Sequence, residues 1–157
     1  MHLIILKYPI HFLAYGFGFG LIPVMPGTFG TLVGVGILYF LLPLDPTYYL
    51  GLIFAGSAIG VFICGQTAKD LGKNDPGKIV WDEIIGFLVA MFLIPFTWSW
   101  VLIGFIIFRI FDIWKPYPIK IIEKTRNPGL GIMADDIIAG LYTVTCLHII
   151  RWCIEIF

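Results

Sequence analysis

Charged residues are scarce in this chain of 157 residues, since Asp, Glu, Lys and Arg make up only 13% of it. A typical soluble domain carries about 25% charged residues. Hydrophobic residues account for 59% of the sequence, and a chain this short cannot bury so much apolar surface inside a water-soluble globule. We therefore predict an integral membrane protein, and the length fits one domain that spans residues 1–157.

An excess of positive charge, a cysteine framework and a cleavable leader are also missing. The formal net charge is zero, so no basic stripe is available to follow nucleic-acid phosphates, and we expect no nucleic-acid partner. Cys64, Cys146 and Cys153 lie in apolar stretches without metal-ligand spacing, which excludes a disulfide framework and a cysteine-based zinc site. No small-residue cleavage site follows an apolar core in residues 1–20, so we expect no cleaved signal peptide.

Long apolar segments, separated mostly by proline and glycine, dominate what is present. They lie at residues 8–22, 28–42, 48–67, 79–94, 97–115 and 133–157. Because unpaired backbone is too costly in hydrocarbon, these segments predict an all-α fold, a compact polytopic membrane helical bundle of about five or six helices. Several segments are shorter than the ~20 residues that a straight span needs, so some helices are expected to be short or re-entrant. Whether residues 8–22 span the bilayer or lie at its interface stays open.

Basic residues gather in two connections between these segments, and they suggest a topology. The first connection holds Lys69, Lys73 and Lys78, and the second holds Arg109, Lys115, Lys120, Lys124 and Arg126. The turns at 43–47 and 95–100 contain no Lys or Arg. If consecutive helices form hairpins, both basic groups face one side, which the positive-inside rule makes the cytoplasm. Arg151 is an exception and Lys7 is unplaced. A single kinked span over 84–108 is the alternative, and we favour the hairpin.

Acidic residues lie where predicted helices meet that same side. They are Asp82, Glu83, Asp112, Asp135 and Asp136. Asp82, Gly86 and Ala90 share one helix face, and Asp136 and Gly140 repeat the spacing. Since small residues permit close helix contact in lipid, Asp82 is expected to face the bundle interior. The alternative is that these carboxylates only cap helix N-termini, where the helix dipole favours anions.

A second polar group follows an apolar run at 101–108. Arg109, Asp112 and Lys115 are spaced three residues apart just before Pro116. An exposed ladder of ion pairs is one interpretation. At a membrane boundary, a carboxylate between two cations also suits a site that holds a metal and a phosphate. Oxygen donors without a Cys or His set favour Mg²⁺ over zinc.

Other phosphatase chemistries do not fit the sequence. Cys146 and Arg151 are separated by four residues rather than the five of cysteine-dependent phosphatases, and neither an Asp-x-Asp loop nor a P-loop occurs. Metal-assisted displacement at phosphorus remains. The stretch 26–31 opens a helix and could bind phosphate through its amides, although an ordinary turn and cap is the simpler interpretation.

Four stretches together resemble the signature blocks of the phosphatidylglycerophosphatase A family. They are Pro26-Gly27-Thr28-Phe29-Gly30-Thr31, Val80-Trp81-Asp82-Glu83-Ile84-Ile85-Gly86, Phe108-Arg109-Ile110-Phe111-Asp112-Ile113-Trp114-Lys115-Pro116 and Gly131-Ile132-Met133-Ala134-Asp135-Asp136. The stretch 66–70 also matches, and the blocks occur in family order. Two positions depart from the expected pattern: Thr31 stands in place of Ser, and Pro128 in place of Gly.

The resemblance implies a phosphoric monoester hydrolase of phospholipid biosynthesis. It would remove the terminal phosphate of phosphatidylglycerophosphate, with Mg²⁺, to leave phosphatidylglycerol at the cytoplasmic face of the bacterial inner membrane. Under this hypothesis the metal is bound, or water activated, by Asp82, Glu83, Asp112, Asp135 and Asp136. Arg109 and Lys115 would clamp the phosphate. Thr28 and Lys69 are weaker candidates for contact with the lipid headgroup, and Asp70 for a supporting role.

Two other functions use intramembrane acids. A phosphatidyl-transferase-like enzyme would need an Asp-Gly start to its motif, and no Asp-Gly dipeptide occurs. A small ion- or proton-coupled transporter would need polar residues continuing to mid-membrane, whereas 87–93 and 101–107 are apolar. The lipid phosphatase hypothesis makes one geometric demand: Asp82, Asp112 and Asp136 must converge beside Arg109 and Lys115.

Overall fold

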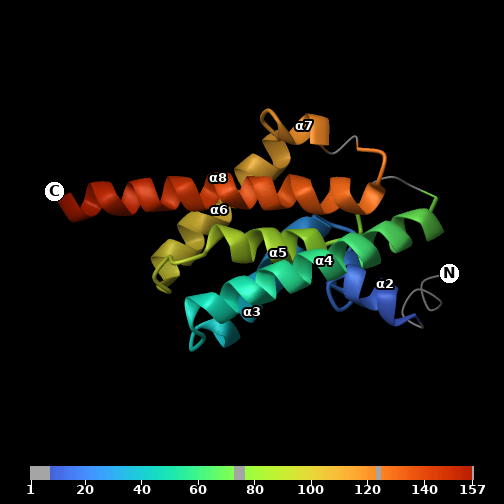
Figure 1. Ribbon diagram of the computed structural model, residues 1–157, viewed down its shortest axis with the longest axis horizontal. Helices are drawn as coiled ribbons and strands as arrows, with labels where there is room; N and C mark the ends of the chain where they lie inside the picture. Colours follow the sequence, from blue (N-terminus) through green and yellow to red (C-terminus); the bar gives the residue numbers. More distant parts are fainter. Residues whose placement is uncertain (1–7, 73–76, 123–124, 157) are drawn as a thin grey trace.

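The computed structural model describes residues 8–72, 77–122 and 125–156, and these residues form an all-α bundle (Figure 1). The elements are α2 (Pro9–Ala14), the 3₁₀ helix η1 (Phe19–Leu21), α3 (Pro26–Leu41), α4 (Pro46–Asp70), α5 (Trp81–Ala90), α6 (Trp98–Trp114), α7 (Ile119–Ile122) and α8 (Pro128–Ile156). The predicted fold class is confirmed. Lys7, Lys73 and Lys124, which entered the topology argument, lie outside the described residues.

Of the helices in residues 8–72, 77–122 and 125–156, two are long and apolar enough to cross a membrane. They are α4, with 25 residues, and α8, with 29. Their length exceeds the ~20 residues that span a hydrocarbon core, whereas the apolar helix α3 has 16 residues. Large apolar side chains also remain on the outside of the bundle, such as Phe40 at 77% and Phe54 at 73% exposed. Both observations suit a protein that associates with lipid.

The described part of the first apolar segment contains only short pieces of helix. α2 has six residues, too few to cross a bilayer. The chain then turns through Gly16 and Gly18, whose φ angles are 53° and 94°, before η1 begins. The Val80 amide donates to the Ala14 carbonyl at 2.9 Å, which attaches this turn to the start of α5.

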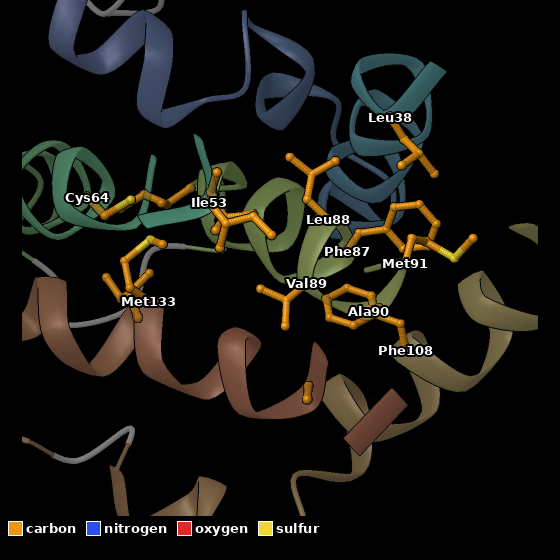
Figure 2. Close-up of a cluster of buried hydrophobic side chains, with 14 of the residues drawn as sticks. Leu38, Ile53, Cys64, Phe87, Leu88, Val89, Ala90, Met91, Phe108 and Met133 are labelled. Carbon is orange, nitrogen blue, oxygen red and sulfur yellow. The ribbon is translucent and has the colours of Figure 1, made fainter. Parts of the chain in front are cut away.

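α5 is the centre of the bundle. It packs against α3, α4, α6 and α8, and Figure 1 shows it between α8 and α4. Phe87 is completely buried, and in Figure 2 it lies with its α5 neighbours close to Phe108 of α6, whereas Met133 of α8 lies farther along the core, beside Cys64 of α4. After its acidic first turn, α5 is apolar on all sides, as expected of a helix in a core. A helix enclosed by other helices does not need to span the bilayer, so the ten residues of α5 are enough. Acidic side chains at its start are therefore held in place from several directions.

α5 and α6 form a hairpin. The chain leaves α5 at Ala90, passes Pro95 and re-enters a helix at Trp98, with Thr97 accepting from the Trp100 amide at 3.4 Å as the N-cap. Near the other end, the Arg109 guanidinium of α6 lies 4.0 Å from Glu83 of α5. The predicted hairpin is confirmed, and the alternative of one kinked span is wrong.

α8 begins five residues earlier than the predicted segment. Asn127 Oδ1 accepts from the amides of Gly129 and Leu130, at 3.1 and 3.4 Å, and Pro128 takes the first helical position. The proline that departs from the family pattern therefore starts a helix. Asp135 and Asp136 lie two turns inside α8, so for this pair the helix-cap interpretation is wrong.

Candidate metal and phosphate site

The candidate site begins with a close contact between α5 and α8. A Cβ added to Gly86 would lie 2.7 Å from the Asp136 carbonyl oxygen, and a Cβ added to Gly140 would collide with the Gly86 carbonyl oxygen. Side chains of any size would hold the two helices apart here. The prediction that small residues permit close approach is confirmed, and it sets the distance between the acids one turn away.

Those acids form a compact cluster. Ligand oxygens of Asp82, Glu83 and Asp136 all lie within 4.8 Å of one another. Asp82 is 8% exposed and Asp136 is 2% exposed, so both carboxylates are inside the bundle. Asp82 faces the interior as predicted, and two residues separated by more than fifty positions in the sequence meet through the glycine contact.

Each member of the cluster has a buried oxygen without a partner. Within the described residues, Asp82 Oδ1, Glu83 Oε2 and Asp136 Oδ1 accept no hydrogen bond. Buried carboxylates are normally paired, hydrogen-bonded or bound to metal, because an uncompensated buried charge is costly. The donor set consists of hard oxygens, which is the set that Mg²⁺ and similar cations take. The cluster therefore fits a divalent cation.

Asp112 and Arg109 border this cluster. The Arg109 Nη1 donates to Asp112 Oδ2, three residues along α6, and the guanidinium also faces Glu83. Asp112 lies close enough to Glu83 and Asp136 for its charge to act on both. The side chains of Arg109 and Asp112 are only 16% and 14% exposed, so the interpretation of an exposed ion-pair ladder is wrong. Arg109 Nε is buried without an acceptor in the described part of the chain.

Lys115 joins the site through a different acid. It ends α6 in the left-handed conformation, and its Nζ donates to Asp135 Oδ2 at 2.6 Å. The other oxygen, Asp135 Oδ1, accepts from the Asp136 amide at 3.0 Å. Asp135 thus contacts Lys115 with one oxygen and the backbone amide of Asp136, a member of the three-acid cluster, with the other. This geometry favours a role for Asp135 in holding Asp136 and Lys115 in place.

The remaining predicted residues divide into two groups. Thr28, at the start of α3, lines a groove together with Arg109. Lys69 is exposed at the end of α4, and Asp70 pairs with His11 Nε2 at 3.3 Å and accepts from Gln66 Nε2 at 2.8 Å. In the described part of the chain, neither Lys69 nor Asp70 has a hydrogen bond or ion pair with the acidic cluster. Asp70 instead connects α4 with α2.

Gly27 is a site residue that the sequence argument missed. A Cβ at this position would collide with Glu83 Oε1 and lie 3.0 Å from Arg109 Nη1. A Cβ on Gly30, one turn later, would lie 2.7 Å from Val80 Cβ. The glycines of stretch 26–31 therefore make room for α5 and α6. Glycines at three- and four-residue spacing (27, 30 and 34) are a signal of a packing face that was available in the sequence.

Comparison with known proteins identifies the family. The family model of phosphatidylglycerophosphatase A matches residues 12–151. The chain belongs to the phosphatidylglycerophosphatase A family. The resemblance based on the four motifs is thereby confirmed, and with it the class of enzyme, a phosphoric monoester hydrolase.

Curated relatives of this phosphatidylglycerophosphatase A family chain cover nearly all of it. Phosphatidylglycerophosphatase A of Escherichia coli is 46% identical over 143 residues, which cover 90% of this chain and 83% of the relative. The Haemophilus influenzae protein of the same name is 42% identical, covering 92% and 90%. A Bacteroides thetaiotaomicron protein named "Putative phosphatidylinositol-3-phosphatase" is 35% identical, covering 88% and 91%. No solved structure matches.

Proposed function

We propose that this protein hydrolyses phosphatidylglycerophosphate to phosphatidylglycerol and inorganic phosphate, with Mg²⁺, at the cytoplasmic face of the bacterial inner membrane. One observation carries the proposal: three clustered acids each have a buried oxygen without a partner, and the guanidinium of Arg109, whose Nε is buried without an acceptor, lies 4.0 Å from one of them, Glu83. A cation and a phosphate together complement such a site. The names of the Escherichia coli and Haemophilus influenzae relatives support the lipid substrate.

In this proposal the acidic residues bind the cation and the basic residues bind the phosphate. Asp82, Glu83 and Asp136 would hold Mg²⁺, which when bound supplies charge stabilisation at phosphorus and a more acidic water. Arg109 binds the phosphate through its free N–H, and Asp112 holds the guanidinium in that orientation. Preorganised donors of this kind stabilise charge that develops in the transition state.

Lys115 and Asp135 act together in this proposal. Lys115 contributes a second cation at the phosphate end, and its ion pair with Asp135 fixes where that charge lies. Asp135 also accepts from the Asp136 amide, so the pair connects the end of α6 with the acidic stretch of α8. The sequence predicted Asp112 and Asp135 as further metal ligands. In this proposal Asp112 instead positions Arg109, and Asp135 positions Lys115.

The location of the polar groups supports chemistry at a membrane surface. On α5, every residue after Glu83 is apolar or glycine, from Ile84 to Ala90. A transporter would require the polar path to continue along the bundle. Lys69, Lys78 and Arg126 add positive charge to the connections of the described chain, which supports the cytoplasmic assignment.

Phosphate release by the purified full chain tests this function. We expect release from phosphatidylglycerophosphate that requires Mg²⁺, stops on addition of a chelator and returns when Mg²⁺ is restored. Phosphatidic acid and phosphatidylinositol 3-phosphate belong in the same assay, because the Bacteroides thetaiotaomicron relative carries the name of a phosphatase for another lipid. Metal-independent release, or release from phosphatidylinositol 3-phosphate alone, would contradict the proposal.

A further inference from the structure

A groove of about 740 Å³ lies between the start of α3 and one face of α6. It is lined by Met25, Thr28, Phe105, Ile106, Arg109, Ile110, Ile113, Trp114 and Lys120. Its volume lies within the ~300–1,000 Å³ of typical ligand sites. Ile106, Ile110 and Ile113 recur along α6 with helical spacing and are 50%, 52% and 68% exposed. The groove therefore has a long apolar wall that the protein itself does not cover.

One end of this groove joins the acidic site. Arg109 lines the groove, and the same guanidinium contacts Asp112 and faces Glu83. Thr28 stands at the groove beside Gly27, whose missing side chain leaves space for Glu83 and Arg109. A molecule in the groove can thus reach the guanidinium of Arg109, which faces Glu83 of the acidic cluster.

The groove has a second cation in its lining, on a different helix from Arg109. Lys120 lies on α7, a short helix whose neighbour Ile119 is completely buried. In the described residues Lys120 has no ion pair with the acidic cluster, whereas Arg109 faces Glu83 of the cluster and also pairs with Asp112. An apolar wall with two separate cations complements an amphiphile that carries hydrocarbon and two anionic groups.

We propose that this groove binds the glyceride part of the lipid substrate, with an acyl chain along Ile106 and Ile110 and the phosphodiester at Lys120. The inference rests on the proposed function, since it places the terminal phosphate at Arg109. Phosphatidylglycerophosphate has a phosphodiester as well as a terminal phosphomonoester, and phosphatidic acid has only the phosphomonoester. Lys120 is thus a specificity residue that distinguishes these two lipids.

Filling the groove tests the acyl-chain half of the proposal. Ile106→Trp and Ile110→Trp should raise KM for long-chain phosphatidylglycerophosphate in mixed micelles about tenfold, which corresponds to ~1.4 kcal/mol. Turnover of the deacylated, water-soluble headgroup should not change. Leu102→Trp is the matched control, because Leu102 is 60% exposed, lies one turn earlier on α6 and does not line the groove. Equal effects of Leu102→Trp and Ile110→Trp, or an equal loss on the deacylated substrate, would overturn the assignment.

Removing the charge of Lys120 tests the headgroup half. Lys120→Gln should lower kcat/KM for phosphatidylglycerophosphate about tenfold and leave kcat/KM for phosphatidic acid unchanged, because hydrogen bonds from a charged donor are stronger than those from a neutral amide. An equal loss on both lipids would show that Lys120 does not recognise the phosphodiester.

A binding measurement separates this proposal from the proposed function. Phosphatidylglycerol carries the phosphodiester and the acyl chains but has no phosphate to release, so native mass spectrometry of the full chain reports the groove without catalysis. We expect the wild type to retain phosphatidylglycerol better than Ile110→Trp or Lys120→Gln. If the wild type releases no phosphate but still retains phosphatidylglycerol better than the two variants, the proposed function is wrong and the assignment of the groove to the lipid is supported. If all three retain the lipid equally, the groove assignment is wrong whatever the activity.

Discussion

The two ends of α5 differ in whether the polar groups there have hydrogen-bond partners. At the C-terminal end, called the far end here, the Tyr49 hydroxyl donates to the Leu88 carbonyl at 2.7 Å, and His148 Nε2 lies 3.3 Å from the Phe92 carbonyl. At the N-terminal end, called the near end, buried oxygens of Asp82 and Glu83 have no partner in the described chain. Since residues at both ends are buried, the unpaired groups mark the near end as the place where a ligand must bind. The far end serves stability.

The largest effect should come from neutralising the near end. Asp82→Asn and Asp136→Asn should lower phosphate release by at least about 10²-fold, the scale of losing one group that stabilises the transition state. Both variants should be as stable as the metal-free wild type or more so, because each removes an uncompensated buried charge. Thermal unfolding with and without Mg²⁺ checks this: the wild type should gain stability from the cation and the variants should not. Glu155→Gln, an exposed carboxylate near the end of α8, is the control and should behave as wild type.

The next effect should follow from separating the helices at the glycine contact. Gly86→Ala should cost about 1–3 kcal/mol through overpacking and should also reduce activity, since it moves Asp82 away from Asp136. Gly51→Ala is the matched control in α4, where an added Cβ meets nothing within 4 Å. Chemical denaturation and phosphate release of both variants provide the measurement. Wild-type activity in Gly86→Ala would show that the close contact does not set the acidic site.

A smaller effect is expected at the far end. Tyr49→Phe removes the hydrogen bond to Leu88 and should cost about 0.5–1.5 kcal/mol of stability with kcat and KM unchanged. A fall in kcat larger than the change in folded fraction would mean that the two ends of α5 are coupled. The comparison between the ends would then fail.

The smallest effect concerns the exposed start of α4. The Thr47 amide donates to Asp45 Oδ1 and lowers the pKa of that carboxyl. A lowered pKa in the folded state adds stability at neutral pH that is lost as the pH falls through the range where Asp protonates. Asp45→Ala should therefore lower the midpoint of thermal unfolding slightly at neutral pH and leave it unchanged in acid. An equal difference at both pH values would exclude the charge of Asp45 as its cause.

The sequence contained the pattern that brings the acids together but not all of their partners. Asp82 with Gly86, and Asp136 with Gly140, could be predicted because four-residue spacing places each pair on one helix face. The pairing of Lys115 with Asp135 could not, because it depends on how α6 ends in a left-handed residue and where α8 lies. On spacing alone, Lys115 was expected to continue the series of Arg109 and Asp112.

Helix starts and close approaches were the other features that spacing left undetermined. The predicted last segment left out the proline- and glycine-rich residues 128–132 after Asn127, so the start of α8 was placed too late and its acids appeared terminal. Gly27 was interpreted as part of a turn, whereas its role comes from the side chains of Glu83 and Arg109 opposite it. Lys69 and Asp70 matched a family stretch, yet Asp70 pairs with His11, which no motif indicated.

Divalent cation binding to the full chain in lipid nanodiscs tests the central claim most directly. Mn²⁺ followed by electron paramagnetic resonance, with Mg²⁺ as competitor, reports the acidic cluster without any substrate. The account predicts that the wild type binds Mn²⁺ and releases it to Mg²⁺, that Asp82→Asn and Asp136→Asn each lose this binding, and that Glu155→Gln retains it. Undiminished binding in Asp82→Asn and Asp136→Asn, or no binding by the wild type, would contradict it.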